Sequence, residues 1–585
     1  MPGFMCCRRS SGKIEPGVLA GSNTKPDPNL LKPIIRIFEE RIQTKKIESK
    51  KTAIHFSDRA TLTFNQVNSM GSCMAKNITE RLGYEYKVNN PEGELVIAIS
   101  LPLSEKAIAL ILGVLKVGAA YIPLDPDMPE RLLLDVLMLA RPVMLITDDN
   151  GKIFNKYDIN KFTDICKVCS VEELWIDTDF ALEEKSRRAS IEQAWDIDFL
   201  DGHPENKTPI PERSIVLIHS HGLRNNPVIV RLSNNSIMNL VSYHWSKFKM
   251  SSKDAYCVTV SMASAESLPQ IFVPLLLGST LYIFRRVDLT DMDNFAKNVS
   301  WSNITSLSIP THHLGEFLNC IDFHGRDKMA KSFNRLKHVI CRGAYITSDQ
   351  VKLFFAIFKT GVTLSNTSGS IETTVDVACE MYKSLKDYES KLHVERPTLS
   401  MVVDNSKIYI LDDKLDVVKE ETLGQICVSG DCLALGYVKQ DDQSGEKFGF
   451  TLNPYASSPK LQRLFRTGEY GRIVKGDGGT RVLYLEGRQD SLVKVRANIF
   501  STDDVRNVIK DALETVEDCA IFVTHEDANA NEVTLTCFAV LAKGLKEADV
   551  PNQADFEFTL KEVLPEWAIP NDLKIVDKLP SMQNG

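Results

Sequence analysis

The chain lacks any apolar run long enough to cross a membrane. Its longest apolar stretches, at 107–114 and 272–284, are short or interrupted, whereas a membrane-spanning helix needs about 20 apolar residues. No apolar segment follows Arg8 and Arg9 near the N-terminus, so a secretory signal is not predicted either. We therefore expect a cytoplasmic protein with no membrane partner.

Clustered basic residues and paired cysteine motifs are also scarce. The net charge of −8 comes from 69 Lys and Arg and 77 Asp and Glu, spread through segments of mixed sign. A nucleic-acid surface would gather Lys and Arg, so no nucleic-acid partner is expected. The cysteine count of 13 is odd, and Cys166-x-x-Cys169 has no second pair that would complete a zinc site. The cysteines are predicted to be free thiols.

What the chain does have is enough length for more than one domain. Its 585 residues exceed the roughly 250–300 at which a single core usually divides. A hydrophobic fraction of 43% and a charged fraction of 25% are typical of a globular protein. We predict a disordered leader at 1–27, which is rich in Gly, Ser, Pro and Lys. A large N-terminal domain at 28–486 and a small C-terminal domain at 487–585 follow.

The order of apolar and polar segments predicts an α/β fold. Between about 94 and 341, strand-like runs alternate with helical segments such as 105–117, as expected for βαβ units and parallel strands. After about Pro397 shorter strands with turn signals predict a barrel-like subdomain, followed by a compact α+β unit. Residues 150–213 are rich in charge, and we expect an irregular or inserted surface region there.

Two turns near the C-terminal end carry a more specific signal. The run 464–473, LFRTGEYGRI, precedes 484–496, YLEGRQDSLVKVR, and each holds a Gly beside charged residues. With LKVGAAYIPLDP at 115–126, they resemble the adenylate-forming superfamily of nonribosomal peptide synthetase adenylation domains, acyl-CoA synthetases and luciferases. The resemblance implies a large domain of stacked mixed sheets plus a β-barrel-like subdomain, closed by a small α+β lid. It also implies ATP, Mg²⁺, and phosphopantetheine on a carrier domain outside this chain.

The superfamily binds phosphates in a loop after a strand, where backbone amides and one ammonium cradle the triphosphate. The matching segment follows the strand-like run 214–219, and the resemblance assigns nucleotide binding to Ser220, Gly222 and Arg224. Val228 stands where the family has a lysine. Either Arg224 supplies the missing charge or phosphate binding is impaired, because arginine and lysine are not interchangeable at close range.

The adenine and Mg²⁺ segment would be 366–374, NTSGSIETT. Gly369 and Glu372 keep the family pattern, so the resemblance assigns nucleotide binding to both. It also gives Glu372 a catalytic role and Mg²⁺ coordination, since a carboxylate is a hard oxygen ligand. Ser368 replaces the family's aromatic residue and Ala344 replaces a common acid. Purine recognition is therefore expected to be weaker.

The ribose segment reads RTGEY where the family has RTGDY. Glu469 would accept hydrogen bonds from two ribose hydroxyls, one methylene farther out than aspartate. Arg488 resembles the family arginine near the ribose and α-phosphate, and Arg488 and Lys494 are further catalytic candidates. Asp490 matches the hinge about which the small domain rotates between two conformations.

The acid-binding pocket carries the substrate prediction. A buried substrate ammonium needs a carboxylate partner, and α-amino-acid activators place an Asp at the position of Ala265. Here the acid is displaced by one position to Glu266, as in the insect β-alanyl–amine synthases of the ebony type. The resemblance implies a β-alanine-like amino acid bound by Glu266 and His312. The alternatives are a solvated or core-satisfied Glu266, and His312 and His313 as paired packing residues.

The last seven residues, LPSMQNG, resemble the start of the family's final motif, whose lysine would follow Gly585. Together with Val228, this predicts diverged or weak activity. Two other interpretations stay open, a catalytically degenerate binding or scaffold module and an acyl-CoA-ligase-like enzyme. Glu266 argues against the latter, because a fatty or aryl acid has no ammonium to pair with it.

Overall fold

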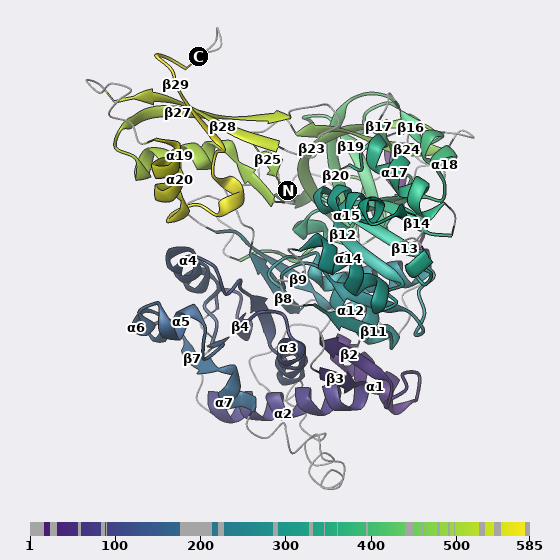
Figure 1. The fold of residues 1–585 in the computed structure, drawn as a ribbon, viewed down its shortest axis with the longest axis vertical. Coiled ribbons are helices and arrows are strands. Elements are labelled where there is room, and N and C mark those ends of the chain that lie inside the picture. Colours follow the sequence, from purple (N-terminus) through teal and green to yellow (C-terminus); the bar gives the residue numbers. More distant parts are fainter. Residues whose placement is uncertain are drawn as a thin grey trace, which may run out of the picture.

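Two large mixed sheets, a third antiparallel sheet and a small C-terminal unit make up the fold (Figure 1). The computed structural model describes residues 17–23, 32–56, 60–83, 88, 90–175, 213–219, 227–284, 291–326, 331–343, 345–359, 361–393, 396–438, 449–458, 461–476, 480–488, 492–495, 498–525, 533–542 and 552–579. Over these residues, none of the helices has the length and apolar character that crossing a membrane requires. The α/β class predicted from the sequence is confirmed.

The first sheet has seven strands, most of them parallel. Their order is β21 (Gly436–Tyr437), β9 (Ile229–Ser233), β8 (Ser214–His219), β5 (Ala120–Pro123), β4 (Val96–Ser100), β6 (Met144–Thr147) and β7 (Lys167–Ser170). The helices of this region are α2 (Phe64–Leu82), α3 (Glu105–Val117), α4 (Glu130–Ala140), α5 (Lys152–Asn155), α6 (Ile159–Thr163) and α7 (Val171–Trp175). The antiparallel pair β8–β9 flanks residues 220–226, where the sequence predicts the phosphate loop.

The second sheet has nine strands with a parallel centre. Their order is β18 (Met401–Val402), β15 (Ala378–Tyr382), β14 (Thr363–Ser368), β13 (His338–Arg342), β12 (Ser306–Pro310), β10 (Ala255–Val258), β11 (Thr280–Ile283), β2 (Thr52–Phe56) and β3 (Ala60–Thr63). Its helices are α1 (Ile34–Gln43), α11 (Asn234–Lys247), α12 (Ser267–Leu277), α14 (Met292–Trp301), α15 (Thr311–Phe323), α17 (Ser348–Phe358), α18 (Leu385–Glu389) and the 3-10 turn η3 (Ile371–Thr373). One apolar core contains residues of both large sheets and of α1, α2, α3 and α12.

Local chemistry sets the ends of the helices at the centre of this core. Thr63 caps α2 in a reciprocal box with Gln66, and the Ser104 hydroxyl caps α3 by accepting a hydrogen bond from the amide of Ala107. α3 ends at Gly118, whose φ of 82° is left-handed and therefore favours glycine. The helix predicted at 105–117 is confirmed.

The third sheet is antiparallel. It runs β1 (Val18–Ala20), β19 (Ser406–Leu411), β20 (Gly424–Gly430), β23 (Arg463–Lys475) and β22 (Gly449–Leu452), with β24 (Arg481–Arg488) also paired to β23. The two-stranded β16 (Leu392–His393) and β17 (Arg396–Pro397) lie apart from it. Among the described strands the pairing does not close into a barrel.

The prediction of a disordered leader at 1–27 is wrong for Val18–Ala20, which form β1. Val18, Leu19 and Ala20 pair with Tyr409, Ile408 and Lys407 of β19. Val18 and Leu19 are each only 7% exposed, so a three-residue strand is held by long-range pairing and burial. Such a strand is too short to produce a periodic pattern.

The prediction of an irregular region from 150 to 213 is wrong for its first part. Residues 152–175 form α5, α6, β7 and α7, and β7 extends the first sheet in parallel beside β6. Phe162, Cys169 and Leu174 are buried. Elements of four or five residues leave no helical or strand period, so tertiary packing alone defines them.

The C-terminal unit has a core of its own. Its elements are β25 (Leu492–Val495), β26 (Asn498–Ser501), α19 (Thr502–Ala512), β27 (Val516–His525), β28 (Val533–Leu541), α20 (Gln553–Lys561), the 3-10 turn η8 (Glu566–Ala568) and β29 (Asp572–Ile575). β27, β28 and β29 form one sheet, and α19 packs against β27. These elements are green-yellow to yellow in Figure 1 and lie at its upper left.

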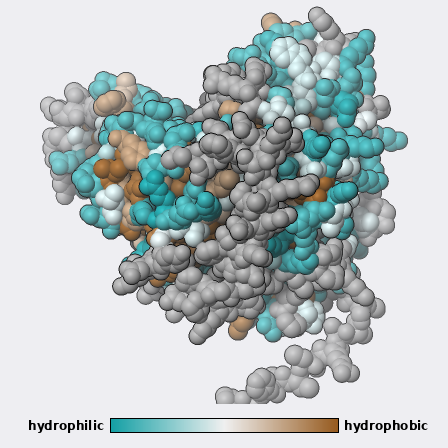
Figure 2. All heavy atoms as spheres, turned by 90° about the horizontal axis from the view of Figure 1, so that it is seen from below, coloured by the Kyte–Doolittle hydropathy of each residue, from teal (hydrophilic) through white to brown (hydrophobic). Residues whose placement is uncertain are grey.

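The described surface seen from below is largely hydrophilic, with smaller hydrophobic areas between the polar side chains (Figure 2). Large apolar side chains that remain exposed in the described chain include Trp301 and Phe323, at 75% and 87%. Single exposed apolar residues of this kind are normal for a folded domain.

Candidate functional site

A tight turn between β14 and β15 brings two predicted site residues together. Gly369 follows β14, and a Cβ there would lie 2.2 Å from the carbonyl oxygen of Val375, so only glycine fits this close approach. The backbone of Thr374 and Val375 is left-handed, with φ of 52° and 74°, which is a strained conformation for side chains branched at Cβ. The turn places Glu372 in η3 and sends Asp376 into the interior.

Glu372 is held from two sides. The hydroxyl of Tyr437 donates to its Oε1 at 3.0 Å, and the amide of Ala434 donates to its carbonyl oxygen at 2.8 Å. η3 also contacts β9, the strand that follows the predicted phosphate loop. A carboxylate has about four lone-pair sites, so the hydrogen bond from Tyr437 leaves acceptor capacity for a cation. Mg²⁺ is usually held by one or two carboxylates together with substrate phosphates, and Glu372 fits that donor chemistry.

The sequence did not predict that Tyr437 would contact Glu372. It lies 65 residues from Glu372, on the two-residue strand β21. No spacing rule connects the two, although the tyrosine follows a Gly in a strand-like run.

A buried ionic cluster lies directly behind the turn. The carboxylate of Asp376 accepts two hydrogen bonds from the guanidinium of Arg342, at 3.0 Å from Nε and 2.9 Å from Nη2. The Nε2 atom of His244 lies 2.8 Å from Asp376 Oδ2, and Arg342 Nη1 donates to the hydroxyl of Ser308. Side-chain exposure is 4% for Arg342, 3% for His244 and 1% for Asp376. The cluster joins α11, β12, β13 and the turn.

The charges of the cluster follow from its burial. Burial would raise the pKa of Asp376, but Arg342 and the hydrogen bond from His244 outweigh it and hold this pKa well below its ordinary value. Burial lowers the pKa of His244 from 6.5, and this outweighs the attraction of Asp376. Burial would likewise lower the pKa of Arg342, but Asp376 and Glu266 raise it. At neutral pH the cluster therefore contains an ionised Asp376, a charged Arg342 and a neutral His244.

A small cavity opens beside this cluster. Its volume is about 20 Å³, which is room for about one water. Its polar lining residues are His244, Tyr256, Gln270, Ser306, Ser308 and Arg342, and apolar residues such as Val273 and Ile340 complete it.

Neither of the two predicted acid-binding residues lines this cavity. Glu266 is half-buried at the N-cap of α12, and it acts electrostatically on Arg342. Ala265 is buried in the core shared by the two large sheets. His312 lies in the first turn of α15, where its ring packs against that of His313 at a centroid distance of 4.1 Å. His312 is not among the residues that line the cavity.

The ribose and phosphate candidates lie on neighbouring strands. Glu469 on β23 is the register partner of Arg488 on β24. The amide of Glu469 donates to the hydroxyl of Thr467 at 3.0 Å, and that hydroxyl donates to the carbonyl oxygen of Ile426 at 2.8 Å. The turn that carries Glu469 is thus anchored to β20.

The remaining candidates are placed only in part. Lys494 lies on β25, where its register partner is Ile499 of β26. Four other predicted residues lie outside the described chain: Ser220, Gly222, Arg224 and Asp490. Val228 is half-buried immediately before β9.

Known proteins that are similar to this chain belong to the family that its motifs resemble. The family described as AMP-binding enzyme matches residues 40–438 of this chain. The beta-alanyl-bioamine nonribosomal peptide synthetase ebony of Drosophila melanogaster is 25% identical over 528 residues, covering 89% of this chain and 55% of that protein. Zwittermicin A synthase ZmaJ of Bacillus cereus is 23% identical, covering 94% and 93%. The chain thus spans about half the length of the ebony relative.

Solved structures agree on the fold. An artificially fused adenylation–PCP di-domain from Klebsiella oxytoca, NpsA-ThdA, superposes with a TM-score of 0.72 at 18% identity, covering 93% of this chain and 86% of that one. IdnL1 superposes with a TM-score of 0.70 at 16% identity, covering 94% and 99%.

Proposed function

The chain belongs to the AMP-binding enzyme family, and on that premise we propose that it activates a short ω-amino acid such as β-alanine with ATP. The substrate carboxylate attacks the α-phosphorus, the bond to the oxygen that bridges to the β-phosphate breaks, and pyrophosphate departs, which gives an aminoacyl-adenylate. A pantetheine thiol of a carrier domain then takes the aminoacyl group as a thioester and AMP is released. Last, an amine accepts the aminoacyl group as an amide and the thiol is released. In this proposal residues 28–486 form the catalytic unit and residues 487–585 the lid.

The observation that carries the proposal is the arrangement around Glu372. The turn at Gly369, the hydroxyl of Tyr437 and the contact with β9 present its carboxylate beside the strand that leaves the candidate phosphate loop. Bound there, Mg²⁺ would neutralise charge on the phosphates. Glu469 would accept hydrogen bonds from the ribose hydroxyls, and Arg488, its register partner on the neighbouring strand, would bind the α-phosphate.

Glu266 supports an amino-acid substrate. It is half-buried at the N-cap of α12 and acts electrostatically on the buried Arg342. A carboxylate at the edge of the cluster is the partner that a buried substrate ammonium needs. A fatty or aryl acid has no ammonium, so Glu266 favours a short amino acid over the substrate of an acyl-CoA-ligase-like enzyme.

A second candidate function is a degenerate module that binds a nucleotide or partner without turnover. Val228 in place of a lysine and Ser368 in place of an aromatic residue favour it, because both remove contacts to the nucleotide. The ionic cluster also lines a cavity of only about 20 Å³, which has room for about one water. Weak adenylation lies between the two functions and is our expectation for this chain.

ATP–pyrophosphate exchange separates these possibilities. The full chain is assayed with β-alanine, α-alanine and hexanoate, and nucleotide binding is measured separately by calorimetry. We expect slow exchange with β-alanine that drops by about 10²-fold in Glu372→Gln, since this removes one charge-stabilising contact. Glu316→Gln, on the exposed face of α15, is the matched control. Exchange with hexanoate alone would indicate the ligase-like enzyme, and nucleotide binding without any exchange would indicate the degenerate module.

A further inference from the structure

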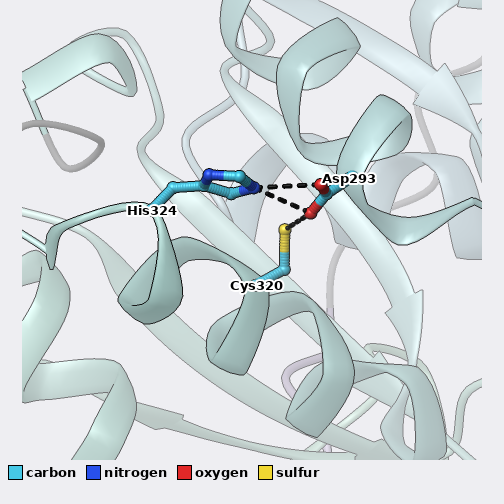
Figure 3. Close-up of side chains that lie close together, drawn as sticks. All are labelled: Asp293, Cys320 and His324. Atoms are coloured by element: carbon cyan, nitrogen blue, oxygen red, sulfur yellow. Dashed lines mark hydrogen bonds and ion pairs between the residues drawn. The ribbon is translucent and has the colours of Figure 1, made fainter.

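We propose that Asp293, Cys320 and His324 form a zinc-binding site at the junction of α14 and α15. Figure 3 shows the three side chains converging, with the imidazole and the thiol both directed at the carboxylate. One ligand atom from each residue lies within 4.8 Å of the others. The site is separate from the adenylation site and does not depend on the proposed function.

The helices place these residues without distortion. Asp293 lies in the first turn of α14, where the carboxylate of Asp291 accepts a hydrogen bond from its amide at 3.0 Å. Cys320 is in the last turn of α15 and His324 is its C-cap, so the two are four residues apart and on one face of the helix. α14 packs against α15, which brings the carboxylate to the other two side chains.

The distances already approach those of a coordination shell. Cys320 Sγ lies 2.7 Å from Asp293 Oδ1, and His324 Nε2 lies 3.0 Å from both carboxylate oxygens. In a tetrahedral zinc site the metal–ligand bonds are about 2.0–2.3 Å, which separates neighbouring ligand atoms by roughly 3.3–3.7 Å. A cation would therefore enter by moving the carboxylate oxygen away from the sulfur and the nitrogen by about 1 Å or less.

The donor set selects the metal. One sulfur, one nitrogen and one oxygen suit zinc, whereas Ca²⁺ and Mg²⁺ take oxygen ligands. A thiolate and a carboxylate neutralise the two positive charges. Three protein ligands leave the fourth position to a water, which can reach the site because the side chains of His324 and Asp293 are 32% and 48% exposed.

Zinc binding at this site would release one proton. Zn²⁺ replaces the thiol proton of Cys320, so one proton is released to solvent and a Zn–S bond forms. His324 binds through Nε2 as the neutral tautomer that carries its proton on Nδ1. The hydrogen bonds that Cys320 and His324 make to Asp293 are thereby exchanged for bonds to one cation. No oxidant or other reactant is needed.

Bound zinc would tie the end of α15 to the start of α14. The opposite end of α15 begins at Thr311, whose hydroxyl donates to the carbonyl oxygen of Arg342 at 2.8 Å. The metal would thus stiffen a helix that touches the buried ionic cluster at its other end. This gives the site a structural role.

The test uses the full chain after treatment with a chelator and its removal. Zn²⁺ is titrated in competition with a chromophoric chelator, and Co²⁺ is bound as a spectroscopic substitute. We expect one zinc per chain and a near-ultraviolet thiolate-to-cobalt band. Asp293→Asn, Cys320→Ser and His324→Gln should each weaken binding by more than about tenfold, since even supporting residues of metal sites contribute 10–100-fold.

Matched controls separate this site from other donors. His313→Gln changes a half-exposed histidine on the same helix, and Cys6→Ser with Cys7→Ser removes the adjacent N-terminal thiols. Both should bind zinc as the parent chain does. The proposal is overturned if the parent chain binds no zinc. It is also overturned if the cobalt complex lacks the thiolate band, or if the triple variant of Asp293, Cys320 and His324, folded by circular dichroism, binds zinc as tightly as the parent.

Discussion

Removing either partner of the buried ion pair should destabilise the protein, and the two losses should depend on pH in opposite directions. Arg342→Met leaves the carboxylate of Asp376 buried, whereas Asp376→Asn leaves the guanidinium of Arg342 buried. The two side chains are 4% and 1% exposed, so water cannot replace the lost partner. Breaking a pair of this kind costs about 3–5 kcal/mol in the free energy of unfolding.

The pH dependence comes from His244, which is 2.8 Å from Asp376. In the parent chain burial lowers its pKa from 6.5, so the stability that depends on neutral His244 is present above this value and is lost as the pH falls. In Arg342→Met a protonated His244 can serve as the cation for Asp376, which raises its folded pKa above 6.5. That stabilisation is fully present below 6.5 and is lost as the pH rises through the folded pKa.

In Asp376→Asn the effect has the opposite sign. The nearby charge of Arg342 opposes protonation of His244, and the attracting carboxylate is gone, so the pKa of His244 falls further. One proton changes the free energy of unfolding by at most about 1.4 kcal/mol per pH unit. The ordinary histidine pKa of about 6.5 lies one unit above pH 5.5, so Asp376→Asn should gain about 1.4 kcal/mol between about pH 5.5 and pH 8, while Arg342→Met loses stability over the same range. The stability difference between the two variants should therefore change by more than about 1.4 kcal/mol.

The measurement is urea denaturation followed by tryptophan fluorescence at both pH values. The double variant Arg342→Met with Asp376→Asn should recover much of the loss, because it leaves no unpaired charge. Adding His244→Gln to Arg342→Met should abolish the acid rescue. If the two single variants change in parallel with pH, His244 does not exchange protons with the cluster and the assignment of charges is wrong.

Three further predictions concern the candidate site. Glu266→Ala should weaken β-alanine binding by about 2–4 kcal/mol through an unpaired ammonium, measured by calorimetry; unchanged binding would remove Glu266 from the pocket. Val228→Lys should raise the rate of ATP–pyrophosphate exchange at least about tenfold by adding a phosphate contact, and a rate equal to that of the parent would show that another cation already acts there. Gly369→Ala should destabilise the protein by about 1–3 kcal/mol, because its Cβ would meet the Val375 carbonyl oxygen at 2.2 Å. Gly315→Ala within α15, where the nearest atom is 3.3 Å away, should be neutral or stabilising by up to about 1 kcal/mol. Equal melting temperatures for these two variants would contradict the steric argument.

Residues that act on their close neighbours could be recognised from the sequence alone. Ser104 and Gly118 mark the two ends of α3 through hydrogen bonding and backbone conformation, which are local effects. Gly369 and Glu372 lie three residues apart in one turn, so their order along the chain already defined the segment that carries a carboxylate. The family and the α/β fold followed from such short motifs and from the alternation of apolar runs.

The tertiary structure alone decided which distant residues meet. His244, Arg342 and Asp376 come from a helix, a strand and a turn that lie 34 to 132 residues apart, and no local pattern predicts an ion pair at such separations. The same is true of Tyr437 beside Glu372 and of β1 beside β19. The sequence shows which side chains can ionise, donate or accept, whereas the register of strands and the packing of helices determine their partners. Burial then sets their charge, because the cost of removing an ion from water depends on everything that surrounds it.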